Sequence, residues 1–317
     1  MSRRSVVQTT ATAVLLAVLP AACGPAPADP ALDRVRLVTD GPEATSAVAA
    51  MLQAYGGTEA WDRMANVEYR YTLSFYGGQP APVRLTHQLQ RLGLGEEPQV
   101  YIEDIDGPER QIARLDGAAF SLMQDGAPVG DSSQIEFRET YARIVRWSFL
   151  MPWILLDPAS RLESRGVRTP QTAGPVPAGP CDVVRLRFER PTDGGGTDDW
   201  HDIYISRLSR LIEQVHSYRA QPNDFRLSVW SDHQNFGGIR VATRRRTYAS
   251  DAGGAIGKLE AVDEYDDIHF DAPFDASIFH APAAGTATAD DPTAGAPGGT
   301  PQDDPPKDSA PDTIPAR

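Results

Sequence analysis

The sequence has very few cysteines and lacks the common motifs of metal, nucleotide and hydrolase sites. Cys23 and Cys181 are the only cysteines in 317 residues, so the chain does not carry the disulfide framework of a small secreted domain. There is no His-x-x-x-His pair and no Cys-x-x-Cys pair, and we expect no metal ion. A Gly-x-Ser-x-Gly elbow, a phosphate-binding loop and a dinucleotide fingerprint are also missing, so the motifs predict no cofactor and no enzyme activity.

Positive charge is scarce relative to negative charge. Lys and Arg together number 30 against 43 Asp and Glu, which gives a net charge of −13. This balance makes nucleic acid a poor candidate partner, because a nucleic-acid surface is itself strongly negative. Residues 283–317 are mostly Ala, Pro, Asp, Thr and Gly, with Ile314 as the exception. Such a composition cannot bury enough apolar surface to offset its ordering entropy, and it predicts a disordered acidic tail.

No apolar run approaches the roughly 20 residues that span a bilayer as a helix. The clearest run, residues 13–19, follows Arg3 and Arg4 and leads into the small residues Ala21 and Ala22. A charged start, an apolar centre and a small-residue exit are the three parts of a secretory signal peptide. The sequence therefore predicts export from the cytoplasm.

A cysteine stands at the expected cleavage point of this signal. The exit resembles the lipobox of bacterial lipoproteins, although Pro20 stands where that pattern usually has leucine. The resemblance implies that Cys23 becomes the first mature residue and carries lipid, which anchors the protein in the cell envelope, facing the periplasm or the exterior. A rival cut after the A-x-A site at residues 26–28 would release a soluble protein that begins near Asp29.

These features divide the chain into four segments. We expect a signal peptide over residues 1–22, a proline-rich flexible tether over 23–42, a folded domain over 43–282 and the acidic tail over 283–317. Cys181 opens an apolar run inside the folded domain, so it is predicted to be a small core residue.

The start of the folded domain has the spacing of helices followed by a strand. Small and apolar residues recur at helical spacing over residues 43–55, and Gly56 and Gly57 end this predicted helix. A second short helix is expected from Thr58. Residues 67–75 then alternate between large apolar and polar side chains, which predicts a strand with one wet face.

Further strands are predicted on both sides of one helical segment. Four more strands complete a first meander before residue 124, with Asp-Gly hairpin signals between three of them. Residues 132–152 suit a helix that ends or kinks at Pro152. Residues 147–156 are the most apolar stretch after the signal. They are expected to be a core segment that covers the sheet, a lid over a cavity, or a surface that touches the membrane. Six strands follow between residues 182 and 270.

The fold class that results is α+β. About eleven antiparallel strands with one interposed helical segment predict a large curved antiparallel sheet, or an unclosed β-barrel, with covering helices.

Three places resemble one known family. They are residues 55–61 before the strand at 67–71, the hairpin at 202–215, and residues 237–242 with the ending at 268–279. These stretches resemble the outer-membrane lipoprotein-sorting (LolA/LolB-like) superfamily, over roughly residues 44–282. The resemblance implies an unclosed antiparallel barrel whose helices cover an apolar cavity, and members that bind lipids or the acyl chains of lipoproteins.

From the signal and the resemblance, we expect a monomeric, non-catalytic envelope lipoprotein that binds lipid or acyl chains. Its expected process is the trafficking of lipids or lipoproteins. The candidate lining residues are Tyr69, Tyr71, Leu73, Phe75, Leu85 and Leu89, and the candidate cover is Trp147, Phe149, Leu150 and Trp153. The same residues could equally form a filled core.

Two alternatives stay open at this point. The same fold could act as a structural or assembly partner in the envelope. A hydrolase or lyase could use His201 and His233, with carboxylates at Asp199, Asp202 and Asp232 nearby, if the two histidines share a hydrogen bond or a carboxylate.

Residues 244–246 are three consecutive arginines. On a strand, Arg245 points away from the side taken by Arg244 and Arg246. One of these two sets would face inward or to a rim, where an arginine could meet a phosphate or carboxylate headgroup. Pairing across strands with Asp263 or Glu264 is the alternative.

Overall fold

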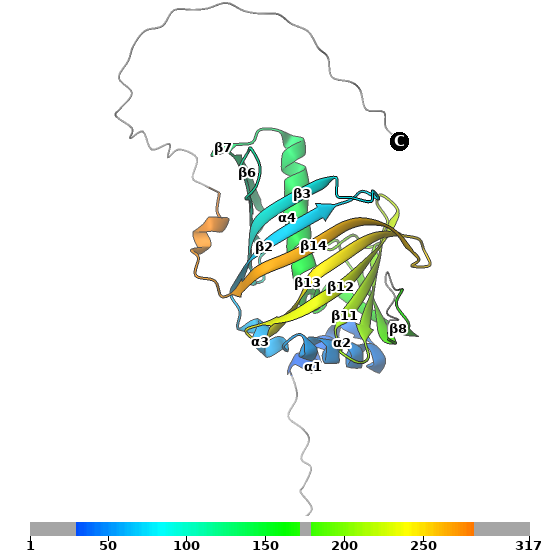
Figure 1. Cartoon of the computed structure of the whole chain (residues 1–317). Helices are drawn as coiled ribbons and strands as arrows, with labels where there is room; N and C mark the ends of the chain where they lie inside the picture. The colour runs from blue at the N-terminus through cyan, green and yellow to red at the C-terminus, as the bar shows by residue number, and fades with distance from the viewer. Residues whose placement is uncertain (1–29, 172–178, 282–317) are drawn as a thin grey trace, which may run out of the picture. The chain divides into compact units, whose positions relative to one another are not determined.

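The computed structural model describes residues 30–171 and 179–281 (Figure 1). The helices are α1 (Pro30–Val38), α2 (Pro42–Ala54), α3 (Thr58–Asp62) and α4 (Ser132–Ile154), and a 3-10 turn lies at Ala276–Phe279. The strands are β1 (Thr39–Asp40), β2 (Asn66–Phe75), β3 (Arg84–Gly93), β4 (Gln99–Asp104), β5 (Gln111–Asp116), β6 (Ala119–Gln124), β7 (Ala127–Pro128), β8 (Ser160–Arg168), β9 (Cys181–Phe188), β10 (Trp200–Ser206), β11 (Ile212–Arg219), β12 (Asp224–Phe236), β13 (Ile239–Ser250) and β14 (Ile256–Phe270).

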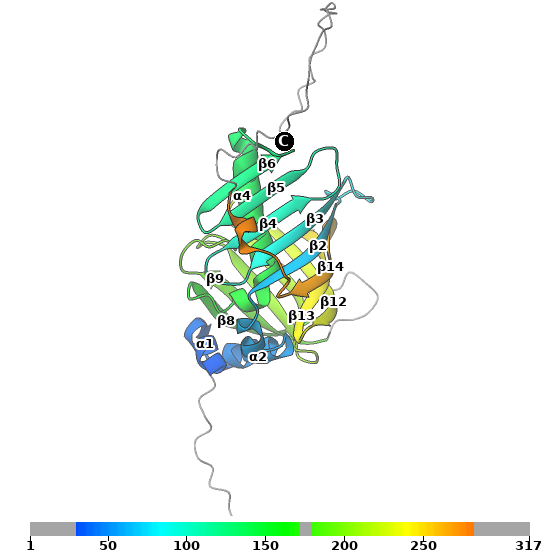
Figure 2. The same cartoon turned by 90° about the vertical axis from the view of Figure 1, so that its left-hand side faces the viewer.

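All strands of the described residues belong to one sheet of 14 strands in the order β1-β8-β9-β10-β11-β12-β13-β14-β2-β3-β4-β5-β6-β7. Neighbours are antiparallel except for β1, which runs parallel to β8. The pairing of β14 with β2 joins the two meanders that α4 separates in the sequence. In both views the sheet curls around α4, which runs along its inner side (Figures 1 and 2).

This architecture confirms the predicted α+β class with a large curved sheet that is not closed. The strand count is higher than the expected eleven, because β1, β7 and β8 were not predicted. β1 and β7 have two residues each, which is too short for any periodicity to show. In β8 only Leu162 and Val167 are large and apolar among nine residues.

Helix α2 confirms the helix predicted over residues 43–55. Its buried side is made of Ala44, Ala47, Val48, Met51 and Leu52. The helix ends before Gly56, which has a φ of 118°. A Cβ at Gly56 would lie 2.3 Å from the carbonyl oxygen of Gly238, so only glycine lets this end pack against the turn between β12 and β13.

The folded part begins earlier than expected. Helix α1 and strand β1 occupy the second half of the range 23–42, which was expected to be a tether. Val35 and Val38 are buried in the core, so these turns are part of the packed structure because they bury apolar surface. The predicted signal peptide, Cys23 and the tail at 283–317 lie outside the described residues.

Helix α4 has its C-terminal end in the core. Phe149, Leu150, Met151 and Trp153 are buried, so this end of the apolar stretch is a core segment, which is one of its expected roles. Pro152 lies inside the helix, which ends two residues later at Ile154. In the ranges that the structure describes, no helix is long and apolar enough to cross a membrane.

Candidate functional site

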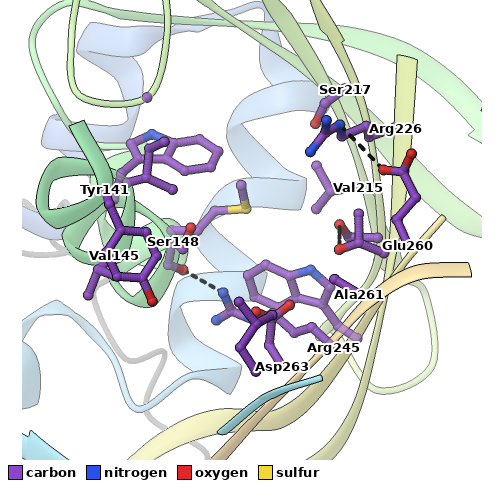
Figure 3. A pocket seen from close by; sticks show the side chains of 18 of the residues that line it. Tyr141, Val145, Ser148, Val215, Ser217, Arg226, Arg245, Glu260, Ala261 and Asp263 are labelled. Atoms are coloured by element: carbon purple, nitrogen blue, oxygen red, sulfur yellow. Dashed lines mark hydrogen bonds and ion pairs between the residues drawn. The ribbon is translucent and has the colours of Figure 1, made fainter. Parts of the chain in front are cut away.

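A pocket of about 360 Å³ lies between α4 and the inner face of the sheet (Figure 3). Its walls come from α4, from β2 and β3, from strands β10 to β14, and from the loop at Asp193 and Gly194. Aromatic and aliphatic side chains provide much of the surface: Tyr71, Leu73, Phe75, Tyr141, Ile144, Val145, Trp147, Val215, Trp230 and Tyr265. A concave, mostly apolar site with a few polar groups is the usual form of a small-molecule pocket.

Four of the predicted site residues line this pocket. Tyr71, Leu73 and Phe75 come from one face of β2, and Trp147 comes from α4 on the opposite side. They meet because alternate residues of a strand point to the same face. The loop at Gly194 runs close behind Trp147, since a Cβ there would lie 1.9 Å from the indole Nε1.

Four other predicted site residues lie in the filled core beside the pocket. Tyr69 and Phe149 stack with ring centroids 4.4 Å apart, and Trp153 stacks on Trp61 at 4.6 Å. Leu150 is buried with them. These side chains fix the end of α4 against the sheet, so they support the pocket without lining it.

Leu85 and Leu89 face the other side of the sheet. In the register of β2 with β3, Tyr71 lies opposite Gln88, whereas Leu89 lies opposite Arg70. Residues directly opposite in an antiparallel pair share a face, so the glutamines of β3 point inward with the tyrosines. The period-two pattern in β3 was correct, but the face assigned to it was not.

Arg245 lies at the base of the pocket. It is 5% exposed and donates from Nη1 to the carbonyl oxygen of Ser148 on α4 at 2.7 Å (Figure 3). Its guanidinium carbon lies 3.8 Å from the ring centroid of Trp230. The neighbour Arg244 points to the other face, where it pairs with Glu264 at 3.5 Å, as strand alternation predicted.

Asp263 lies directly opposite Arg245 in the register of β13 with β14. It accepts a hydrogen bond from the hydroxyl of Tyr71. Burial raises the pKa of Asp263 above its usual range, while the Tyr71 hydrogen bond and the charge of Arg245 act in the opposite direction. Burial also raises the pKa of Tyr71 well above its usual value, so the phenol stays protonated and donates.

A chain of polar contacts ties α4 to the sheet on one side of the pocket. Tyr141 donates to Gln88 Oε1 at 2.9 Å, and Gln90 donates to the same oxygen at 2.6 Å. Gln88 in turn donates to Asp104 at 2.7 Å, and Arg138 of α4 pairs with Asp104 at 2.6 Å. Buried polar groups that are satisfied in this way rigidify a structure, so the helix is held in a defined position over the sheet.

His201 lies on the opposite wall, next to Trp147. Its Nδ1 and the hydroxyl of Ser217 are 2.8 Å apart, and its ring centroid is 4.9 Å from that of Trp147. Burial lowers the pKa of His201 to about 4, because the protonated ring would lose its hydration in this wall.

The hydrolase hypothesis needed His201 and His233 to share a partner. His233 instead has its Nε2 3.1 Å from the hydroxyl of Tyr55. Asp202 pairs with Arg185 at 2.6 Å, and Asp199 accepts from backbone amides. The described residues therefore do not bring these groups together, and no cluster of three His, Cys, Asp or Glu side chains suited to a metal ion occurs in ranges 30–171 and 179–281.

Comparison with known proteins shows a likeness in fold. No protein-family model matches the sequence, and no curated protein matches it. A DUF1329 family protein from Desulfovibrio piger has a TM-score of 0.50 at 10% identity, covering 75% of this chain and 98% of its own. A LolA superfamily protein from Nitrosomonas europaea has a TM-score of 0.48 at 11% identity, with 75% and 98% covered. The fold expected from the sequence resemblance is confirmed, and the likeness concerns the fold alone.

Sequence reasoning missed the polar part of the site. Gln88, Gln90 and Tyr141 gave no signal, because isolated glutamines in a strand look like its wet face. Arg245 was singled out only through the alternation of three arginines, and nothing in the sequence marked it as buried.

Proposed function

We propose that this protein binds the apolar chain of a lipid or acyl group in the pocket between α4 and the sheet. The observation that carries the proposal is a pocket of about 360 Å³ with an aromatic and aliphatic lining, next to a core that is otherwise filled by side chains. Each CH₂ group that leaves water for such a site gains roughly 0.8 kcal/mol. A chain of moderate length therefore binds by burial alone, without catalysis.

The setting of this activity is the cell envelope. The predicted signal peptide and the lipid on Cys23 would hold the domain at a membrane surface, where lipids and lipoproteins are available. The short segment between Cys23 and α1 would then act as the tether. In this role the protein carries or presents a lipid in trafficking across or within the envelope, and the outer membrane is the membrane we propose.

A second candidate function is that of a platform for another envelope protein. Phe137 of α4 is an exposed large apolar side chain that lines a smaller hollow of about 220 Å³ together with Leu73 of β2. Exposed apolar groups of this kind commonly mark contact surfaces. Under this alternative the main pocket would stay free of lipid in the purified protein.

Analysis of the bound lipid separates the two functions. The protein is purified from envelopes, extracted with organic solvent, and the extract is analysed by mass spectrometry against the protein amount. We expect an acyl lipid in a ratio near one per chain. A lipid-free protein contradicts the binding proposal and favours the platform.

A matched pair of variants locates the lipid. Leu73→Trp fills the main pocket from β2, whereas Leu85→Trp makes the same change on the opposite face of the neighbouring strand. We expect the copurified lipid to be lost in the first variant and kept in the second. Equal lipid content in both variants would place the lipid elsewhere.

A further inference from the structure

The pocket contains a buried cation that the protein leaves incompletely paired. A guanidinium has five N–H donors. Arg245 donates from Nη1 to the Ser148 carbonyl, and the Tyr265 side chain is another polar neighbour. Its Nε is buried without a hydrogen-bond partner among the described residues. Leaving donors of a buried charge unpaired is costly, so this arrangement indicates that a ligand completes it.

The carboxylate opposite Arg245 does not supply the missing partner. Within residues 30–171 and 179–281 no ion pair joins Arg245 to an acidic side chain, whereas Arg226, also on the pocket wall, pairs with Asp224 at 3.0 Å and with Glu260 at 3.6 Å. Asp263 is turned to the hydroxyl of Tyr71. Arg219 also lines the pocket without an ion pair among these residues, but its side chain is only half-buried. Arg245 is thus the fully buried cation of the pocket that is open to an external anion.

We propose that Arg245 binds the carboxylate of a single-chain fatty acid whose hydrocarbon chain lies along Leu73, Val145 and Val215. This inference rests on the proposed function and names its ligand class. The planar guanidinium matches a carboxylate geometrically and forms strong charge-assisted hydrogen bonds. The rings of Trp230 and Tyr265, with centroids 3.8 Å and 5.0 Å from the guanidinium carbon, hold it in place.

Size favours a fatty acid over a two-chain phospholipid, and charge favours it over a phosphate monoester. A volume of about 360 Å³ lies in the lower part of the range of roughly 300–1,000 Å³ for small-molecule pockets, which suits one chain. The wall also carries the acidic side chains of Asp193, Glu260 and Asp263. These would repel a doubly charged phosphate more than a singly charged carboxylate.

The test compares ligands of equal chain length and different headgroup. The purified full chain is titrated with dodecanoate, methyl dodecanoate and dodecyl phosphate at pH 8, and binding is followed by calorimetry and by the fluorescence of Trp147 and Trp230. We expect dodecanoate to bind about tenfold more tightly than the methyl ester, as a charge-assisted hydrogen bond implies. Dodecyl phosphate should bind more weakly than dodecanoate.

Variants assign the preference to Arg245. In Arg245→Gln the ratio of acid to ester affinity should fall to about one, whereas Arg244→Gln, on the outer face of the same strand, should keep the tenfold ratio. Arg245→Lys, which keeps the charge without the planar fork, should retain part of it. Near-UV circular dichroism checks the packing of each variant, and the wild-type ratio stands by itself if Arg245→Gln does not fold.

The outcomes separate this inference from the proposed function. Equal binding of acid and ester by the wild-type protein, or tighter binding of dodecyl phosphate, would overturn the fatty-acid assignment and leave lipid binding in place. An unchanged ratio in folded Arg245→Gln would do the same. Failure of all three ligands to bind would overturn the proposed function with it.

Discussion

Three ionisable side chains on the pocket wall are in different environments. Arg245 is charged and stacked on Trp230, Asp263 accepts from Tyr71, and His201 is packed against Trp147. Each lies on a different strand and points inward by strand alternation. The polar groups of the pocket are therefore single side chains from different strands, on an inner face that is otherwise largely apolar.

His201 makes the stability of the fold depend on pH. Its pKa is about 4 in the folded protein and about 6.5 when unfolded. Between these values the unfolded chain binds a proton that the folded one does not, so the free energy of unfolding falls as pH drops from 6.5 toward 4. By linkage, lowering the pH from 8 to 5 costs about 2 kcal/mol at this residue.

We expect His201→Gln to reduce the loss of stability between pH 8 and pH 5 by about 2 kcal/mol. Urea unfolding at both pH values measures this, with His269→Gln as the control because His269 is exposed on β14. If His201→Gln loses as much stability as the wild-type protein over this interval, His201 is not the buried neutral histidine described here.

Single residues also show which features can be predicted from the sequence and which cannot. The alternation at residues 244–246 correctly separated Arg245 from Arg244, because it depends only on the period of a strand. The burial of Arg245 depends on Ser148, nearly a hundred residues earlier, and on where α4 lies. Leu85 and Leu89 were placed on the wrong face because the inner face of β3 is decided by its register with β2.

At the scale of elements, α4 has two roles: its C-terminal end is packed in the core, and its middle part forms one wall of the pocket. Asp131 caps its first turn by accepting from the amides of Ser133 and Gln134 at 2.9 and 3.3 Å. Phe137 near this end is 61% exposed, whereas Phe149 near the other end is buried against Tyr69. The two ends of one helix therefore contribute very differently to stability.

We expect Phe149→Ala to lower the free energy of unfolding by about 3–5 kcal/mol, because it leaves a cavity in a stacked aromatic cluster. Phe137→Ala in the same helix should change it by no more than about 0.5 kcal/mol. Denaturant unfolding of both variants measures the difference. Similar losses in the two variants would mean that α4 is not anchored through its C-terminal end.

The elements that the sequence predicted well are those with long and clear periods. Helix α2, most of α4 and the strand β2 follow from spacing and from glycines at their ends. The missed strands β1, β7 and β8 are stabilised by their neighbours in the sheet, since their own residues carry little pattern. The packing gives the residues of the apolar stretch at 147–156 different roles. Trp147 and Met151 line the pocket, whereas Phe149, Leu150 and Trp153 are packed in the core.

At the scale of the whole described domain, one pairing makes the site possible. β14 pairs with β2, and this pairing joins the two meanders side by side although they are far apart in the sequence. Tyr71 of the first meander and Asp263 of the second meet across this junction. The pocket thus depends on contacts between both halves of the chain, which is why no short motif in the sequence marks it.

Whether this domain is held at a membrane is predicted to depend on Cys23, which lies outside the described residues. If Cys23 carries lipid, the protein is anchored by acyl chains at roughly 0.8 kcal/mol per buried CH₂, and the pocket is presented close to the bilayer from which its ligand comes. If the chain is cut at residues 26–28 instead, the same domain is a soluble carrier. The two forms differ in how a ligand reaches the pocket.

We expect the wild-type protein to sediment with membranes and Cys23→Ser to move to the soluble fraction, because the substitution removes the sulfur that carries the lipid. Cys181→Ala is the matched control: Cys181 is buried, and burial raises the pKa of its thiol to about 12, so it has no part in anchoring and the variant should stay with the membranes. Fractionation with immunodetection measures all three, and mass spectrometry of the mature N-terminus identifies the cleavage site. A wild-type protein that begins near Asp29 and remains soluble would replace the anchored protein by a free carrier, with the pocket and its proposed ligand unchanged.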